Sequence, residues 1–168
     1  MYKNIKSFTK IAEFGRKLLA RPSIELAIPM ISSYARELLK ADRCSVFIYN
    51  EEKNCLWTVV SDGVEKIKIS ADEGIVGASF KEDRALIVND PYSDKRFSPK
   101  IDHETGYITN NIITIPINNA FNKPIGVLQI LNKNEGEFDK EDKRLLTFFN
   151  HYISGYIELA VFFHEEHV

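Results

Sequence analysis

The chain has 168 residues, enough for one domain that buries a sizeable core. Its 22 lysines and arginines nearly balance its 24 aspartates and glutamates, and no basic block occurs, so a nucleic-acid partner is not expected. No apolar run approaches the roughly 20 residues that cross a bilayer. Residues 1–6 also lack the apolar core of a signal peptide, so we expect a cytoplasmic location and no membrane partner.

Two helices are predicted first. Residues 2–20 place apolar side chains at helical spacing, and residues 21–23, Arg-Pro-Ser, interrupt the pattern. A second apolar face runs from Ile24 to Leu39. Pro29 lies inside it, which predicts a kink or a late start.

Strand patterns follow. Residues 45–49 and 56–60 flank a polar turn and predict a hairpin, and residues 66–69 alternate as a half-exposed strand does. The next segments predict a short helix opened by glycine, a brief strand, a long irregular loop, two further strands and a final helix from Asp139: residues 74–80, 86–88, 89–110, 112–117, 125–131 and 139 onward.

This order predicts an α+β fold: a central antiparallel sheet of about six strands, with the second and last helices on one face. The irregular segments, residues 74–80 and 89–110, would then roof a ligand pocket on the other face. We divide the chain into a linker helix (1–22), one domain (23–163) and a tail (164–168).

The two cysteines, Cys44 and Cys55, are expected to be reduced thiols. Without a C-x-x-C pair or paired histidines, the sequence indicates no zinc site, and we assign the thiols no function. No cofactor is expected.

A motif joins the last strand to the last helix. It consists of Asn132, Lys133, Phe138 and Asp142. Lys133 and Asp142 are placed so that an ion pair can tie the two junctions. As a surface pair it would contribute only about 0–1 kcal/mol. A purely structural role is the favoured interpretation.

This motif resembles the N-K-x(n)-F-x-x-x-D-E signature of GAF domains in cyclic-nucleotide phosphodiesterases and adenylyl cyclases, with Lys143 in place of the final glutamate. Four further segments are similar to that family in the same order: its first strand, its G-I-A-G turn, its N-x-P-D-A-Y-x-D-x-R-F loop and its D-x-x-T-G-(F/Y)-x-T segment. They are residues 41–47, 74–77, 89–97 and 102–109. The resemblance covers about residues 25–160 and implies the GAF fold.

The resemblance also implies a site between the sheet and the loops. The base would meet one strand hydroxyl and one carboxylate, and the phosphate would meet backbone N–H groups at a helix start. Loop hydroxyls and a carboxylate would cover the ribose and phosphate, and a glutamine would reach in from the last strand. In that order, these residues are Ser45 and Asp62; Ile75 and Val76; Asp102, Thr105 and Thr109; and Gln129. Such a site meets one negative charge without needing arginines.

Two functions follow from these expectations. The first is a regulatory sensor that binds cAMP or cGMP in this pocket; the second is a GAF-fold dimerisation and relay module whose pocket is empty or holds another small ligand. The loop motifs favour the first. Ser61, where the family often has a base-stacking aromatic residue, and Val76, where it has alanine, favour the second. Gln129 does not choose between cAMP and cGMP, because its amide presents either a donor or an acceptor.

Catalysis is not expected, because no G-x-S-x-G, H-E-x-x-H or phosphate-cradling P-loop occurs. Considered alone, Ser45 is a core hydroxyl and Thr105-Gly106 a turn.

The last helix predicts assembly. Three heptad-spaced series make its apolar stripe wider than covering a sheet requires: Leu145, Tyr152 and Leu159; Phe149, Tyr156 and Phe163; and Leu146, Ile153 and Ala160. We expect a parallel homodimer through the terminal helices that passes ligand state to an output domain, in a fragment of a larger signalling protein or in a stand-alone regulator. The alternative is that residues 2–20 fold back and cover the stripe within one chain.

Overall fold

The computed structural model describes residues 2–20, 24–61 and 66–165. In chain order its elements are α1 (Tyr2–Leu19), α2 (Ile24–Leu39), β1 (Ala41–Asn50), β2 (Cys55–Ser61), β3 (Lys68–Ser70), α3 (Gly74–Glu82), β4 (Leu86–Val88), a 3₁₀ turn (Pro91–Ser93), α4 (Lys100–Thr105), β5 (Ile112–Asn118), β6 (Pro124–Lys133) and α5 (Lys140–Glu165).

The strands form one six-stranded sheet in the order β3-β2-β1-β6-β5-β4, and each neighbouring pair is antiparallel. The two longest strands, β1 and β6, pair at its centre from Ala41↔Lys133 to Ile48↔Gly126. The α+β class and the six-stranded antiparallel sheet predicted from the sequence are therefore confirmed.

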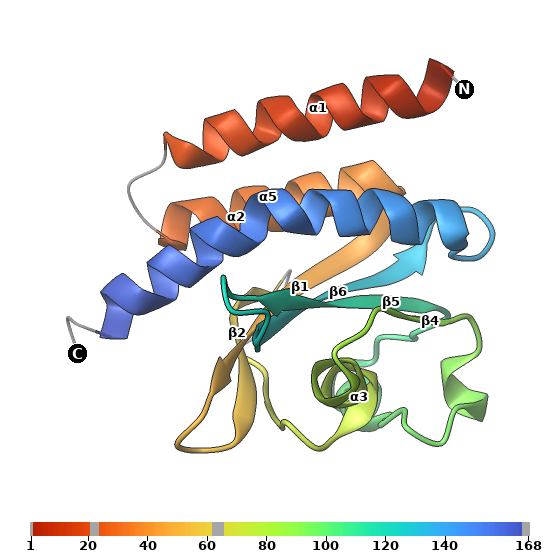
Figure 1. Cartoon of the computed structure of the whole chain (residues 1–168). Helices are drawn as coiled ribbons and strands as arrows, with labels where there is room; N and C mark the ends of the chain where they lie inside the picture. Colours follow the sequence, from red (N-terminus) through yellow and green to blue (C-terminus); the bar gives the residue numbers. More distant parts are fainter. Residues whose placement is uncertain (1, 21–23, 62–65, 166–168) are drawn as a thin grey trace.

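The three long helices lie on one face of this sheet, and α3 lies with the loop segments on the other (Figure 1). The helices α2 and α5 cover one face, and α1 lies over them as an outer layer; α3 lies on the other face. The stripe of α5 that meets the sheet is fully buried and recurs at intervals of three and four residues: Leu146, Phe149, Ile153 and Ile157. This side contains the larger hydrophobic core.

Side chains of β1 alternate between the two faces, as a strand requires. Val46 and Ile48 join the core under the helices, whereas Phe47 joins a smaller cluster with Val76 of α3. Ser45 therefore faces the α3 side of the sheet, where the ligand pocket was expected.

One glycine is required by the close approach of the central strands. A Cβ atom on Gly126 would lie 2.2 Å from the backbone oxygen of Phe47 on the facing strand. Any side chain at this position would have to displace backbone rather than a flexible neighbour.

Three local predictions differ from the structure. The strand expected at residues 66–69 is β3, which begins at Lys68. The segment 89–110, expected to be irregular throughout, contains a 3₁₀ turn and α4. The late start considered for α2 is not seen, because the helix begins at Ile24 ahead of Pro29.

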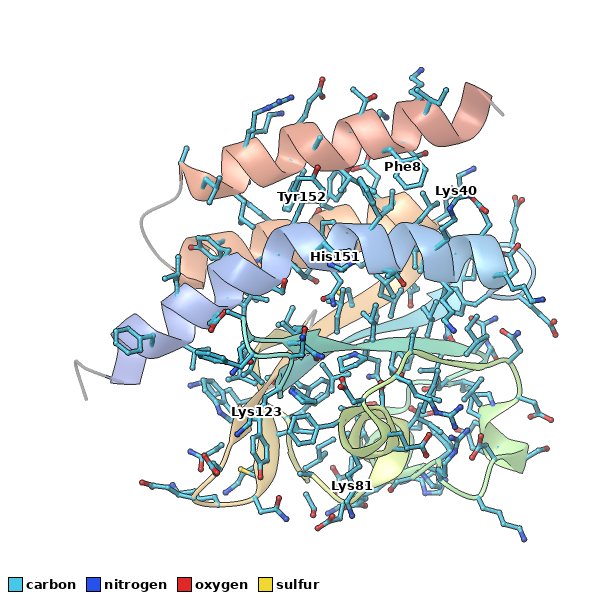
Figure 2. All side chains as sticks on the ribbon, in the orientation of Figure 1. Phe8, Lys40, Lys81, Lys123, His151 and Tyr152 are labelled. Carbon is cyan, nitrogen blue, oxygen red and sulfur yellow. The ribbon has the colours of Figure 1, made fainter. Side chains whose placement is uncertain are left out.

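The helix α1 covers part of the aromatic stripe of α5. Phe8 and Phe148 meet edge to face with ring centroids 4.6 Å apart, and Phe14 lies 5.5 Å from Phe149. Figure 2 shows Phe8 and Tyr152 between the two helices. Phe149, expected at a dimer interface, is fully buried within one chain.

Two large apolar side chains near the end of α5 are more than half exposed. Leu159 and Phe162 are 57% and 56% exposed. Both cysteines are buried thiols that are not joined in a disulfide. Over the described ranges, no helix is both long enough and apolar enough to cross a bilayer.

Candidate functional site

A cavity of about 760 Å³ lies between the sheet, the start of α3 and the segment that carries α4. This volume is in the range of small-molecule sites, about 300–1,000 Å³. Apolar side chains from three strands form its floor, among them Phe47, Ile112 and Leu131. Seven of the eight residues predicted for the ligand site line it: Ser45, Ile75, Val76, Asp102, Thr105, Thr109 and Gln129. The eighth, Asp62, lies outside the described residues.

Two polar side chains lie side by side on the sheet wall. Ser45 of β1 and Gln129 of β6 are register partners, so their side chains emerge together on the cavity face. Ser45 is buried and Gln129 is half-buried. Thr114 of β5 pairs with Gln129 on its other side, is fully buried, and has a hydroxyl without a hydrogen-bond partner among the described residues.

The start of α3 offers backbone donors. The side chains of Ile75 and Val76 are buried in apolar clusters, so only their main chain can meet a polar ligand. N–H groups in the first turn of a helix have no acceptor within the helix. Glu73, at the N-cap position, makes no side-chain capping bond to them. These N–H groups are available to an anion.

Asp102 and Thr109 line the cavity but bind each other. The Asp102 carboxylate accepts hydrogen bonds from the Thr109 N–H and hydroxyl, both at 2.8 Å, and from the Tyr92 hydroxyl at 2.7 Å. The bond to this carboxylate raises the pKa of Tyr92. These contacts fix the loop that roofs the cavity, so a ligand would have to compete for them.

Thr105 is similarly engaged. Its hydroxyl donates to the Ile101 carbonyl at 2.7 Å within α4 and accepts from the Tyr107 N–H at 3.3 Å. This is the turn interpretation considered from the sequence. The residue lines the cavity without a free hydroxyl proton.

Several cationic and aromatic side chains of the cavity were not predicted from the sequence. Arg43, Lys66, Lys68 and Lys100 line it, against the carboxylates of Glu73, Asp102 and Glu104. The described lining therefore has four basic and three acidic side chains. The site expected from the sequence did not need an arginine, whereas the described lining includes one, Arg43. Since β1 alternates, the position of Ser45 on the cavity face also places Arg43 there.

Arg43 packs on an aromatic ring. Its guanidinium carbon lies 3.8 Å from the centroid of the Tyr107 ring, within cation–π range. The Tyr107 hydroxyl donates to Asp42 at 2.7 Å. Burial, together with this bond, raises the pKa of Tyr107. Tyr107 thus connects the roof of the cavity to β1.

The signature motif joins the end of β6 to the start of α5. Lys133 and Asp142 form the expected ion pair. The carboxylate of Asp142 also accepts the Asp139 N–H at 3.0 Å, and Asp139 accepts the Asp142 N–H at 2.9 Å. This reciprocal arrangement caps the helix. The two paired side chains are only 18% and 10% exposed, so the pair is largely buried and not the surface pair we expected.

Asn132 holds the roof segment. Its backbone has φ of +57°, and its side chain accepts the Asn110 N–H and donates to the Ile108 carbonyl, both at 2.7 Å. Phe138 is buried, and the Asn89 side chain binds both its N–H and its carbonyl at 3.0 Å. The motif is therefore a structural lock between the roof, the sheet and α5. No group of three metal-ligating side chains is found in the described ranges.

The profile of one protein family, described as "GAF domain", matches residues 23–157. The chain belongs to the GAF family. Among solved structures, the GAF domain of an Acinetobacter phosphoenolpyruvate-protein phosphotransferase superposes with a TM-score of 0.79 at 18% identity and covers 96% of both chains. At that identity the similarity shows the GAF fold alone.

Sequence relatives of this GAF domain include cyclic-nucleotide phosphodiesterases. A cGMP-specific 3',5'-cyclic phosphodiesterase of Drosophila ananassae is 32% identical over 84% of the chain and 16% of its own length. A dual 3',5'-cyclic-AMP and -GMP phosphodiesterase 11A of Takifugu rubripes is 30% identical over 67% of the chain and 14% of its own length. The chain thus spans less than a fifth of the curated relatives it matches.

Proposed function

We propose that this GAF domain is a regulatory sensor that binds a cyclic nucleotide, cAMP or cGMP, in the cavity between the sheet and α3. The observation that carries the proposal is the cavity itself, because it combines a suitable volume, an excess of basic side chains and the free N–H groups that open α3. These features suit an anionic ligand with an apolar ring system. The phosphodiesterase relatives make a cyclic nucleotide the first ligand to test.

A regulatory role fits the chemistry of the cavity. No histidine or cysteine is among its described lining residues, and the Asp102 carboxylate is occupied by the hydrogen bonds that hold the roof. Among the described lining residues there is therefore no Ser–His or Cys–His pair of the kind that activates a nucleophile for covalent catalysis. An output activity would belong to another domain of a longer protein or to a partner.

Isothermal titration of the chain with cGMP and with cAMP tests the proposal. At least one nucleotide should bind, and Gln129→Glu should weaken that binding by about tenfold or more, because it places a negative charge on the sheet wall of the cavity, where it repels an anionic ligand. Asn134→Asp adds the same charge at an exposed position outside the cavity and should leave the affinity unchanged.

This titration distinguishes the cyclic-nucleotide sensor from the dimerisation and relay module. An absence of heat with either nucleotide at millimolar concentration, from a chain that unfolds cooperatively, would overturn the proposal. It would leave the relay module as the function.

A further inference from the structure

The guanidinium of Arg43 is a half-buried donor group that the fold does not use. It lines the cavity and lies 3.8 Å from the centroid of the Tyr107 ring. Within the described residues it makes no hydrogen bond and no ion pair, and its one identified interaction is with the ring. A stacked guanidinium keeps its N–H groups free at the edge of its plane.

Arg43 differs from the other polar groups of the sheet wall in having a fixed polarity. The Ser45 hydroxyl and the Gln129 amide can each donate or accept, so neither discriminates between the bases. A guanidinium only donates. Arg43 lies two residues before Ser45 on the same strand face, and both line the cavity. A base whose edge meets the Ser45 hydroxyl, as expected, would therefore lie on the side of the sheet that carries Arg43.

We propose that Arg43 makes the cavity selective for guanine over adenine nucleotides. The proposal rests on the function proposed above and names the ligand class for the same site. Guanine presents two adjacent acceptors, O6 and N7, which a guanidinium meets with two parallel N–H bonds. Adenine presents N7 beside an amino group, so one donor of Arg43 would face another donor and lose its partner.

Tyr107 is the positioning residue for this interaction. Its ring fixes the plane of the guanidinium, and its hydroxyl is held by Asp42 at 2.7 Å. Lysine at position 43 would keep the charge but not the planar pair of donors.

The experiment measures the dissociation constants of cGMP and cAMP by titration calorimetry for the unmodified chain, Arg43→Gln and Arg43→Lys. The unmodified chain should prefer cGMP by about 5- to 150-fold, the range of one bidentate contact. Both variants should lose most of that preference, chiefly through weaker cGMP binding. Arg144→Gln is the matched control, since Arg144 also stacks on a ring, that of Phe8, but lies outside the cavity.

The outcomes distinguish a failure of the selectivity from a failure of the sensor function. Equal affinities for the two nucleotides in the unmodified chain would overturn the selectivity and leave the sensor function intact. An equal loss for both nucleotides in Arg43→Gln would show that the arginine meets the shared phosphate, and would also overturn it. Binding of neither nucleotide would overturn the sensor function and the selectivity together. Thermal unfolding of each variant confirms that the fold is retained.

Discussion

Replacing Lys133 with methionine tests the lock between β6 and α5. Methionine keeps the length and apolar stem of the side chain but removes the partner of Asp142. Asp142 would then be a largely buried carboxylate with one remaining donor, the Asp139 N–H at 3.0 Å. We expect the free energy of unfolding to fall.

The magnitude follows from the burial of the pair. An exposed ion pair contributes about 0.2–1 kcal/mol, whereas removal of one partner from a fully buried pair costs about 3–5 kcal/mol. The Lys133–Asp142 pair is closer to the buried case, at 18% and 10% exposure, but the Asp139 N–H still compensates part of the carboxylate charge. We therefore expect a loss of about 2 kcal/mol, which corresponds to about 4–8 °C in Tm for a chain of this length.

Urea unfolding followed by circular dichroism measures this loss. Lys143→Met is the control, because Lys143 is an exposed lysine next to Asp142 in α5. This substitution should change the free energy of unfolding by less than about 0.5 kcal/mol. A double-mutant cycle with Asp142→Asn, which keeps an acceptor for the Asp139 N–H, isolates the pair. A coupling energy below about 0.5 kcal/mol would refute the reasoning, since it would give the buried pair the weight of a surface pair.

Three further predictions concern the strand contact, the helix cap and the exposed side chains near the end of α5. Gly126→Ala should destabilise the chain by at least about 2 kcal/mol in urea unfolding, because its Cβ would lie 2.2 Å from the backbone oxygen of β1; a neutral result would contradict that approach. The backbone N–H of Asp142 holds the pKa of Asp139 below its usual value, so Asp139 contributes stability above the unfolded pKa of about 4, and that contribution is lost as pH falls through the lower folded pKa. Asp139→Asn should therefore lose less stability than the unmodified chain between pH 6 and pH 3, and identical acid-unfolding curves would refute the linkage. We propose that the exposed Leu159 and Phe162 contribute to a homodimer, so glutamate at both positions should give a monomer by light scattering; an unmodified chain that is already monomeric would exclude this dimer.

The sequence predicted those parts of the fold in which local pattern and packing agree. The last helix was evident because its apolar residues repeat at helical spacing and its buried stripe follows that repeat. The partners Lys133 and Asp142 were evident because they lie at two predicted junctions. Their burial was not, because the exposure of a pair depends on what packs around both junctions.

The candidate site was predicted less completely. The resemblance named Ser45 and Gln129, and strand register does bring them together. It also named Asp102 and Thr109, but which of their hydrogen bonds are already made within the chain depends on the path of the roof segment. Arg43 was not predicted, because a charged side chain is ordinarily expected in solvent. The alternation of β1 nevertheless places it on the same face as Ser45.

Coverage of the terminal helix by α1 depended on long-range packing. The sequence left open whether residues 2–20 or a second chain cover the aromatic stripe, since both would bury the same side chains. The contact of Phe14 with Phe149, 5.5 Å between ring centroids, shows that α1 takes part in covering the stripe within one chain. Leu159 and Phe162 lie beyond that contact and remain exposed.

The most direct test of ligand binding in this cavity is a titration followed by nuclear magnetic resonance. Amide signals of the isotope-labelled chain are recorded as cGMP, and separately cAMP, is added. Binding in the cavity predicts that the largest shifts fall on residues 74–76, at the start of α3, and on the roof segment 97–109, with little change along α1. Shifts concentrated on α1 and α5, or no shifts at millimolar nucleotide, would contradict the account.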